Sequence, residues 1–394
     1  MESPAAIPLH KIPIRSRPPP SLLLRTHSLL FTLVFVLSLV LIHLFQLVSL
    51  PLAILAPKVY RNWILHSKES FACLLQGITV VFAGGSEMVL TAGEGVNLDE
   101  VCKTDAHGNV VALDFEKQTV WISNHQQYAD WIHVWILFFM ANISSGICII
   151  LKASLQWAPV VGPAMQLFQF IFLNKNKTLQ KSGLYKSAKA AVEHNLPFSL
   201  LLFPEGTLVS RLTRPKSASF AAAQGIPDLT NLLLPRSTGL LYCLRTLSLT
   251  MPNLTLYDLT IGYEGVPPAG YAQDYFTLSS IFGLRVPSPR IHMHLRKWPL
   301  SQVPIGNKRE GATREELDAE LTEEERRTFE EWVRRRWIEK DELLSNEFYR
   351  NGEFAEGKQG SRKVQVRMRR ADWATLASVP VALAAVVLAV RRVL

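Results

Sequence analysis

Two short polar segments contain residue types that catalyse proton transfer. His125 and Asp130 lie five residues apart, and Glu205 follows about 75 residues later within Phe203 to Thr207. Histidine is the side chain whose ordinary pKa suits proton abstraction near neutral pH, and a nearby carboxylate can hold the imidazole in one tautomer. We therefore interpret His125 as a candidate general base and Asp130 as the group that orients it.

This pairing sets a geometric requirement on the surrounding chain. Residues five apart on one continuous helix would lie about 140° apart and would not share a face. The pair therefore needs a turn at residues 124–127, with a helix that begins near Tyr128. The apolar run Val120 to Ser123 predicts a strand that ends just before His125, and Leu200 to Phe203 predicts a central strand that ends before Glu205.

These residues also carry a family resemblance. The chain resembles the glycerolipid acyltransferases (the 1-acylglycerol-3-phosphate O-acyltransferase superfamily) over roughly residues 30 to 355, and most closely their lysocardiolipin and lysophosphatidylinositol acyltransferase branch. The segments that resemble family motifs are Asn124 to Asp130 (N-H-x-x-x-x-D), Phe203 to Thr207 (F-P-E-G-T), Phe170 to Lys175, Leu234 to Gly239, Tyr257 to Thr260 and Trp337 to Asp341. Lys175 stands where Arg is usual, which keeps the charge but loses the planar fork of a guanidinium.

The resemblance implies a function and a set of site residues. It implies transfer of a fatty acyl group from acyl-CoA, a co-substrate, to the hydroxyl of a lysophospholipid, with no further cofactor. His125 and Asp130 would be catalytic. Glu205 would contact glycerol hydroxyls or orient a basic group, and the other residues expected to bind the acceptor are Lys175, Gly206, Thr207 and Arg211. Two alternatives remain open: a catalytically silent membrane scaffold, and a CoA-independent transacylase or lipid hydrolase that uses the same pair.

Composition and charge favour a membrane protein. Hydrophobic residues make up 48% of the 394 residues and charged residues only 19%, and the mean hydropathy is positive at +0.14. The net charge of +9 suits an anionic membrane surface and phosphate-rich substrates, and no segment resembles a nucleic-acid-binding module. We expect an integral protein of the endoplasmic reticulum whose catalytic domain faces the cytosol.

The sequence predicts one α/β domain, with a mixed or mostly parallel sheet, between membrane segments. We expect a disordered N-terminus (1–21), a membrane helical hairpin (22–83), the α/β domain (84–300), a charged helical extension (301–361), and a basic cluster with a C-terminal membrane span (362–394). Within the domain, residues 84–95 are expected to form a Gly-rich turn region, and residues 131–151 a buried helix followed by a strand.

A histidine pair and the four cysteines are the remaining residue types that could form a site. His292 and His294 would lie on one face of a strand and could form half of a metal site, but no carboxylate or cysteine ligand lies near them in the sequence. Buried structural histidines are the favoured interpretation, so no metal site is expected. The four cysteines are widely scattered, which predicts reduced thiols, and the sequence does not indicate an oligomeric state.

Overall fold

The computed structural model describes residues 7–173, 177–307, 321–355 and 357–393. Within these ranges the strands form one eight-stranded sheet, in the order β10-β1-β9-β8-β4-β7-β5-β6, and a separate hairpin of β2 and β3. The strands are β1 (Glu87–Ala92), β2 (Cys102–Thr104), β3 (Val110–Leu113), β4 (Gln118–Ser123), β5 (Ile147–Lys152), β6 (Ile171–Leu173), β7 (Phe198–Leu202), β8 (Thr255–Tyr263), β9 (Arg290–Pro299) and β10 (Ser361–Gln365).

Strand directions gather several loops at one edge of this sheet. Strands β8, β4, β7, β5 and β6 are parallel to one another, whereas β9 is antiparallel to β8. Strand β1 is parallel to β9, and β10 closes the sheet antiparallel to β1. The carboxyl ends of the five parallel strands therefore meet at the same edge, called here the carboxyl edge, where ligands of α/β proteins commonly bind. The fold confirms the predicted mixed, mostly parallel α/β sheet.

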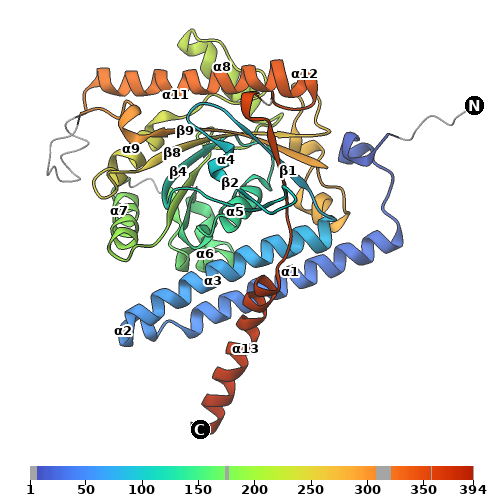
Figure 1. Ribbon diagram of the computed structural model, residues 1–394, viewed down its shortest axis with the longest axis vertical. Helices are drawn as coiled ribbons and strands as arrows, with labels where there is room; N and C mark the ends of the chain where they lie inside the picture. Colours follow the sequence, from blue (N-terminus) through green and yellow to red (C-terminus); the bar gives the residue numbers. More distant parts are fainter. Residues whose placement is uncertain (1–6, 174–176, 308–320, 356, 394) are drawn as a thin grey trace, which may run out of the picture.

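Alternating side chains of the central strands bury both faces of the sheet. On one face, Trp121 and Leu201 pack with the core beneath α5, while Val120 and Leu200 point into the core on the other face. The first face is covered by α5 (Asp130–Met140), with α3 (Pro57–Ile78) and α1 (Leu22–Val48) beyond it; the second is covered by α7 (Lys177–Glu193), α9 (Ser237–Leu247) and α11 (Glu323–Leu343) (Figure 1).

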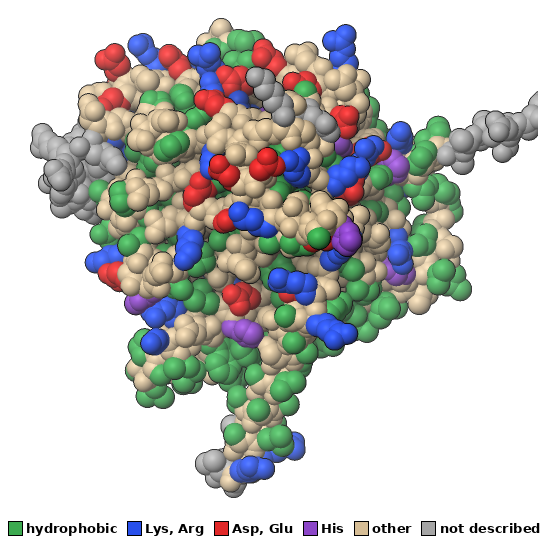
Figure 2. Space-filling model, in the orientation of Figure 1, with side chains coloured by type: hydrophobic (Ala, Val, Ile, Leu, Met, Phe, Trp, Pro, Cys, Tyr) green, Lys and Arg blue, Asp and Glu red, His purple; other side chains and the backbone are tan. Residues whose placement is uncertain are grey.

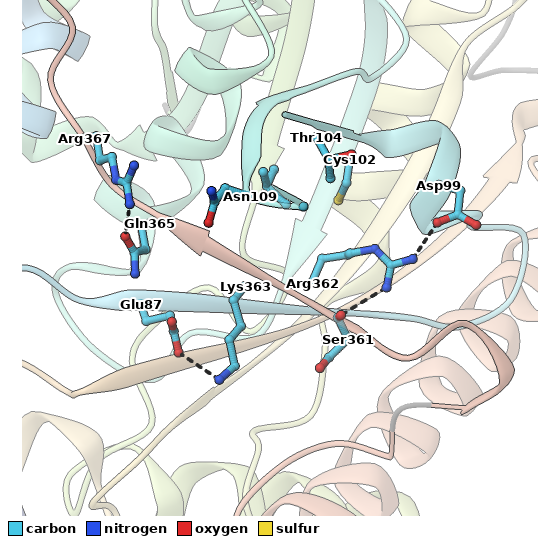
Figure 3. Close-up of a pocket in the computed structure, with 12 residues that line it drawn as sticks. Glu87, Asp99, Cys102, Thr104, Asn109, Ser361, Arg362, Lys363, Gln365 and Arg367 are labelled. Carbon is cyan, nitrogen blue, oxygen red and sulfur yellow. Dashed lines mark hydrogen bonds and ion pairs between the residues drawn. The ribbon is translucent and has the colours of Figure 1, made fainter. Parts of the chain in front are cut away.

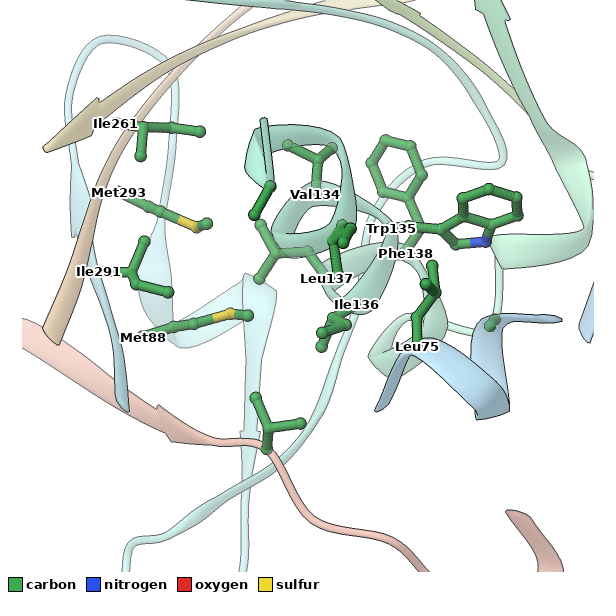
Figure 4. Close-up of a cluster of buried hydrophobic side chains, with 14 of the residues drawn as sticks. Leu75, Met88, Val134, Trp135, Ile136, Leu137, Phe138, Ile261, Ile291 and Met293 are labelled. Carbon is green, nitrogen blue, oxygen red and sulfur yellow. The ribbon is translucent and has the colours of Figure 1, made fainter. Parts of the chain in front are cut away.

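Helix α5 is apolar around most of its circumference because it lies between the sheet and α3. Figure 4 shows Trp135 and Phe138 of α5 on the side of Leu75 in α3, with Met88 and Met293 of the sheet close to the helix. The helix ends at Met140, and β5 begins at Ile147 after a short turn. This confirms that residues 131–151 form a buried helix followed by a strand.

Among the described residues, two helices are long and apolar enough, by length and composition, to cross a membrane: α1 and α13 (Arg370–Val393). Helix α2 (Leu52–Leu55) turns the chain so that α3 packs back along α1, and the Trp63 ring stacks on Phe45 with centroids 4.5 Å apart. Apolar side chains gather over α1, α2 and α13 along the lower side of the molecule (Figure 2). Helix α13 continues beyond the α1–α3 layer to the C-terminus (Figure 1).

Three expectations were wrong or incomplete. Residues 87–92, expected within a Gly-rich turn region, form β1, because the apolar core of this segment pairs with β9 and β10 on either side. Residues 7–21, expected to be disordered, are held against the loop after β8 by Arg17, which donates to Ser280 Oγ at 2.6 Å and Tyr275 O at 2.6 Å. The basic segment at 361–365, expected only to precede a span, forms edge strand β10.

Three further helices connect strands to the elements that follow them. Helix α4 (Leu98–Val101) precedes β2, α6 (Val161–Leu167) follows β5, and α8 (Arg214–Gln224) follows β7. Within the expected charged helical extension (301–361), the structure has α11 together with the turn that leads to α12 (Tyr349–Asn351). Residues 308–320 of the predicted extension lie outside the described residues.

Candidate active site

His125 and Asp130 lie at the carboxyl edge of the sheet. Strand β4 ends at Ser123, and α5 begins at Asp130, so residues 124–129 form the connecting turn that the pair requires. Asn124 fixes the start of this turn, because its side-chain amide donates to Ile261 O at 3.0 Å and its oxygen accepts from Ile261 N at 2.8 Å. The backbone of the turn is therefore tied to neighbouring strand β8.

The Asp130 carboxylate is fully buried and accepts four hydrogen bonds. Its Oδ2 accepts from His125 Nδ1 at 2.8 Å and from the backbone N–H groups of Gln126 and Gln127 at 2.7 and 3.0 Å. Its Oδ1 accepts from the Tyr263 hydroxyl at 2.5 Å. Burial, the Asp130 charge and this hydrogen bond all raise the pKa of Tyr263, which keeps the phenol protonated as a donor.

This arrangement decides which imidazole nitrogen is available. Because Nδ1 faces an ionised carboxylate that can only accept, Nδ1 carries the proton and Nε2 keeps its lone pair. In the part of the chain that the structure describes, no hydrogen bond engages Nε2, and the ring is 19% exposed. The Phe203 ring stacks on the imidazole with centroids 4.2 Å apart and limits its rotation. His125 is therefore held ready to accept a proton at Nε2.

Glu205 lies in the turn after β7 and is only 2% exposed. Its Oε1 accepts from the backbone N–H of His125 at 3.1 Å, and its Oε2 accepts from Leu233 N at 3.2 Å. Burial raises the pKa of the Glu205 carboxyl to about 8, against the opposing effect of these two donors and of the Lys340 charge. The carboxylate that was expected to contact the acceptor thus joins three loops inside the protein.

Backbone contacts complete the connection between the two predicted segments. The N–H of Val209 donates to His125 O at 3.1 Å, and the N–H of Arg236 donates to Pro204 O at 2.8 Å. The structure therefore brings together the segments at 124–130 and 203–209, as the sequence predicted, and adds the segment 233–236 beside them. Residues 230–236 carried only a weak signal in the sequence, through the Leu234 to Gly239 motif.

The other predicted acceptor residues lie in different surroundings. Gly206 has a φ of 71°, a left-handed conformation that favours glycine, and it is exposed next to half-buried Thr207. Arg211 is exposed, and its guanidinium is paired with Asp274 at 3.1 Å. Lys175 lies outside the described residues.

Arg236 lies beside the candidate site, although no pattern in the sequence singled it out. Its exposed side chain lies over Gly206: a Cβ placed on Gly206 would be 3.6 Å from both Cδ and Nε of Arg236. Among the described residues, no ion pair or hydrogen bond engages the Arg236 guanidinium. A guanidinium placed this way is available to an anion that enters beside the Phe203 to Thr207 turn.

Helix α11 supports the site from behind through buried charges. The Asp341 carboxylate accepts from the backbone N–H groups of Thr230, Asn231 and Leu232 at 2.9, 2.6 and 3.2 Å. Its neighbour Lys340 is fully buried, forms an ion pair with Asp258 of β8 and donates to Leu259 O at 2.6 Å.

Burial by itself would raise the pKa of Asp258, but the charges of Lys340 and Arg296 outweigh burial and hold that pKa below its usual range. The 257–260 and 337–341 motifs thus meet in one charged cluster near the turns that carry His125 and Glu205. Asp341 of the second motif holds the loop at 230–232, and Leu233 of the same loop donates to Glu205.

The histidine pair on β9 has a structural environment. His292 and His294 pack against the Phe354 ring with centroids 6.4 and 5.7 Å away, and Thr91 contacts His294 Nδ1 at 3.1 Å. Burial lowers the pKa of each imidazole to about 4, so both are neutral near pH 7. The described residues contain no group of three or more His, Cys, Asp or Glu side chains placed to hold a metal ion.

A separate cavity of about 710 Å³ lies between β10 and the β2–β3 hairpin (Figure 3). Its basic side chains are engaged: Arg362 pairs with Asp99 at 2.5 Å and Lys363 with Glu87 at 3.9 Å. Strands β1, β9 and β8 separate β10 from β4, so this cavity is distinct from the site around His125.

The fold and the site together define the class: an α/β protein with a His–Asp pair at the carboxyl edge of its sheet. The sequence model of the acyltransferase family matches residues 101–261, a range that contains both His125 and Glu205. An uncharacterized acyltransferase of Schizosaccharomyces pombe is 32% identical over 80% of this chain and 83% of its own length.

Two relatives with named substrates show similar coverage. The 2-acyl-1-lysophosphatidylinositol acyltransferase of Saccharomyces cerevisiae is 30% identical over 73% of this chain and 75% of its own. Lysocardiolipin acyltransferase 1 of Gallus gallus is 27% identical over 77% and 68%. The chain therefore belongs to the glycerolipid acyltransferase family, as its motifs indicated.

Proposed function

We propose that this protein transfers a fatty acyl group from acyl-CoA to the free hydroxyl of a lysophospholipid, with His125 as the general base. The observation that carries the proposal is the His125–Asp130 pair at the carboxyl edge of the sheet, with Nε2 open to a substrate. Membership of the acyltransferase family supports the reaction type, because the relatives' names describe acyl transfer to lysophospholipids.

With both substrates bound, this geometry supports direct transfer of the acyl group by a sequential mechanism. The acceptor hydroxyl gives its proton to His125 Nε2 while its oxygen attacks the thioester carbonyl carbon. Asp130 stabilises the imidazolium that forms, because its carboxylate lies 2.8 Å from Nδ1. The carbon–sulfur bond then breaks, and the imidazolium returns the proton to the departing CoA thiolate. No acyl-enzyme forms and no cofactor takes part in this scheme.

We assign the acceptor phosphate to the turn around Gly206. The names of three relatives describe acyl transfer to 2-acyl-1-lysophosphatidylinositol, to lysocardiolipin and, for a probable acyltransferase of Arabidopsis thaliana, to 1-acyl-sn-glycerol-3-phosphate. All three acceptors carry phosphate. Arg236 stands over the exposed Gly206 turn with its guanidinium unengaged among the described residues. Lys175 remains a second candidate for the phosphate, Thr207 for a glycerol oxygen, and Arg211 for the headgroup if Asp274 releases it.

A kinetic comparison tests the phosphate assignment. Arg236→Ala is expected to raise the KM for the lysophospholipid with little change in the KM for acyl-CoA, and Arg236→Lys is expected to recover part of the loss. Arg327→Ala on α11, where the side chain is 74% exposed, is the matched control for loss of one surface charge. If Arg236→Ala changes only the KM for acyl-CoA, the guanidinium serves the donor instead.

We further propose that the protein is embedded in the endoplasmic reticulum membrane, with the catalytic domain in the cytosol. Helices α1 and α13 supply the apolar length, and the Arg-rich segment before α13 favours the cytosolic side. Acyl-CoA, a charged nucleotide conjugate, would then reach the site from water. Protease protection of a tag inserted at residue 353 in sealed microsomes tests this orientation: a tag protected until detergent is added places the domain in the lumen.

The function itself is tested with purified protein and a panel of lysophospholipids. The expected result is release of free CoA and formation of a diacyl product only when both acyl-CoA and an acceptor are present. Turnover of lysophospholipid without acyl-CoA would indicate a hydrolase or transacylase that uses the same His125–Asp130 pair. No turnover with any acceptor would favour the scaffold alternative.

A further inference from the structure

A second group of exposed apolar side chains lies at the carboxyl edge of the sheet. It belongs to neither of the two membrane-length helices. It is the segment Leu155 to Val161, which connects β5 to α6. Trp157 is 78% exposed, and the other exposed apolar side chains of this segment are Leu155, Val160 and Val161. No charged residue occurs from Ala153 to Phe172. An uncharged segment with a largely exposed tryptophan is unusual on a protein face that meets only water.

The backbone beneath these side chains is firmly built. Gly162 packs so closely on the segment that an added Cβ would lie 2.3 Å from Gln156 O, and Gln166 Nε2 donates to the same carbonyl at 2.9 Å. Val160 has a φ of 62°, which is strained for a β-branched residue and persists only where the surroundings impose it. The fold therefore holds the apolar side chains outward, although it has a buried core close by.

This segment adjoins the apolar helix α1. Helix α6 packs against α1, where Gln46 Nε2 lies 3.5 Å from Ala164 O. On the same stretch of chain, Leu47, Leu50 and then Ile54 of α2 expose their side chains. The segment at 155–161 thus leads directly into a helix, α6, that contacts the second half of the proposed membrane hairpin's first helix.

The same helix also follows the carboxyl edge of the sheet. The first half of α1 contacts the turn at Ser279–Gly283 between β8 and β9, where His27 Nδ1 lies 2.8 Å from Gly283 O and Phe31 stacks on Phe282. Its second half contacts α6, which follows the carboxyl end of β5. Because β4, β7 and β5 are parallel, the loops after these strands share the edge that carries His125.

We propose that Leu155 to Val161 is a membrane-contact loop that inserts into the same leaflet as the α1–α3 hairpin. Tryptophan favours the interface between headgroups and acyl chains, and an uncharged segment loses no ion hydration on entry. The loop would bring the bilayer surface to the carboxyl edge, so that a lysophospholipid need move only from the leaflet into the site. The inference rests on the proposed membrane attachment, but it does not depend on which molecule donates the acyl group.

Site-specific labelling of the full chain in phosphatidylcholine vesicles tests the loop. The four native cysteines are buried, so a fluorophore sensitive to polarity can be attached selectively to Trp157→Cys. Leu55→Cys on α2, 78% exposed, marks the proposed membrane hairpin. Thr328→Cys is an exposed position on α11, on the opposite side of the molecule from the end of α13, and serves as the aqueous control (Figure 1).

The expected result is that the label at 157 matches the label at 55. Both would emit at shorter wavelength than the label at 328, with several-fold stronger quenching by lipids that carry a nitroxide on the acyl chain and weaker quenching by iodide. A label at 157 that behaves like the label at 328, while the label at 55 reports lipid, would overturn the loop alone. If the labels at 55 and 157 both report water, the hairpin attachment fails together with the loop.

Discussion

Replacing Asp130 by Asn separates the charge of this side chain from its shape. The Asp130 carboxylate receives three donors on Oδ2 and the Tyr263 hydroxyl on Oδ1. An asparagine can place its oxygen at the Oδ2 position and its NH2 group towards Tyr263, whose hydroxyl oxygen can accept. The turn around His125 should therefore keep its geometry, and the main loss is the negative charge beside the imidazole.

The size of the effect follows from the distance and the burial. The carboxylate oxygen lies 2.8 Å from Nδ1 and is fully shielded from water, so the centres of charge are about 4 Å apart in the imidazolium state. At that separation and an effective dielectric constant of about 20, the attraction is about 4 kcal/mol. Because each 1.4 kcal/mol is roughly a factor of ten in rate, Asp130→Asn should lower kcat by about a thousandfold.

The assay is CoA release from acyl-CoA in the presence of a lysophospholipid, followed with a thiol reagent. Because the four cysteines are buried, the folded protein itself should react little. Tyr263→Phe is the matched control, since it removes one hydrogen bond from the same carboxylate but leaves the charge, and it should cost far less activity. If Asp130→Asn keeps more than about a tenth of wild-type kcat, the charge does not stabilise an imidazolium and the reasoning fails.

Three further outcomes are expected. Burial raises the pKa of Glu205 from 4.5 to about 8, so the folded protein keeps this proton over a pH range in which the unfolded chain loses it. The wild type should therefore lose up to about 5 kcal/mol of stability relative to Glu205→Gln as the pH rises through that range. Denaturation curves in detergent whose difference does not change with pH would contradict this. Asp341→Asn should place an amide N–H against a backbone N–H donor of the loop at 230–232 and lower the free energy of unfolding by about 1–3 kcal/mol. It should also lower kcat more than it changes either KM. An unchanged kcat would show that α11 does not position the site. Gly206→Ala should destabilise the turn by about 1 kcal/mol because φ is 71°, as thermal unfolding can measure, and a fully active, equally stable variant would refute that strain.

The sequence predicted the parts of the site that depend on local chemistry. A strand before His125, a turn, and a helix starting near Tyr128 all follow from apolar runs and from the reach of two side chains five residues apart, and the structure begins that helix at Asp130. The buried strand before Glu205 and the apolar helix of residues 130–140 also follow from local pattern. The geometry of His125 and Asp130 in the structure agrees with what these patterns require.

Other parts of the site depend on partners that are distant in sequence. Glu205 binds two backbone N–H groups, and backbone donors leave no trace in side-chain types. Asp341 reaches its partners about 110 residues away, so a charged helix could be predicted but not its hold on a loop. The position of Arg236 beside Gly206 depends on how two segments 30 residues apart pack together, which the sequence does not indicate.

Two strands were missed for the same physical reason. Strand β1 is short and flanked by glycines, and the turn signal of those glycines is as strong as the signal of its apolar core. Strand β10 contains two basic residues, and only Val364 among its five residues is fully buried. Both strands are stabilised by backbone pairing with neighbours far along the chain, which single-sequence patterns do not report.

We propose that His125 removes the proton from a lysophospholipid hydroxyl during acyl transfer from acyl-CoA. Single-turnover formation of diacyl product by wild type and His125→Ala, in the same detergent and at saturating acyl-CoA and acceptor, measures this step. His125→Ala is expected to form product about 10²–10⁴ times more slowly, with both substrates still bound. Product formation by His125→Ala at the wild-type rate would contradict it.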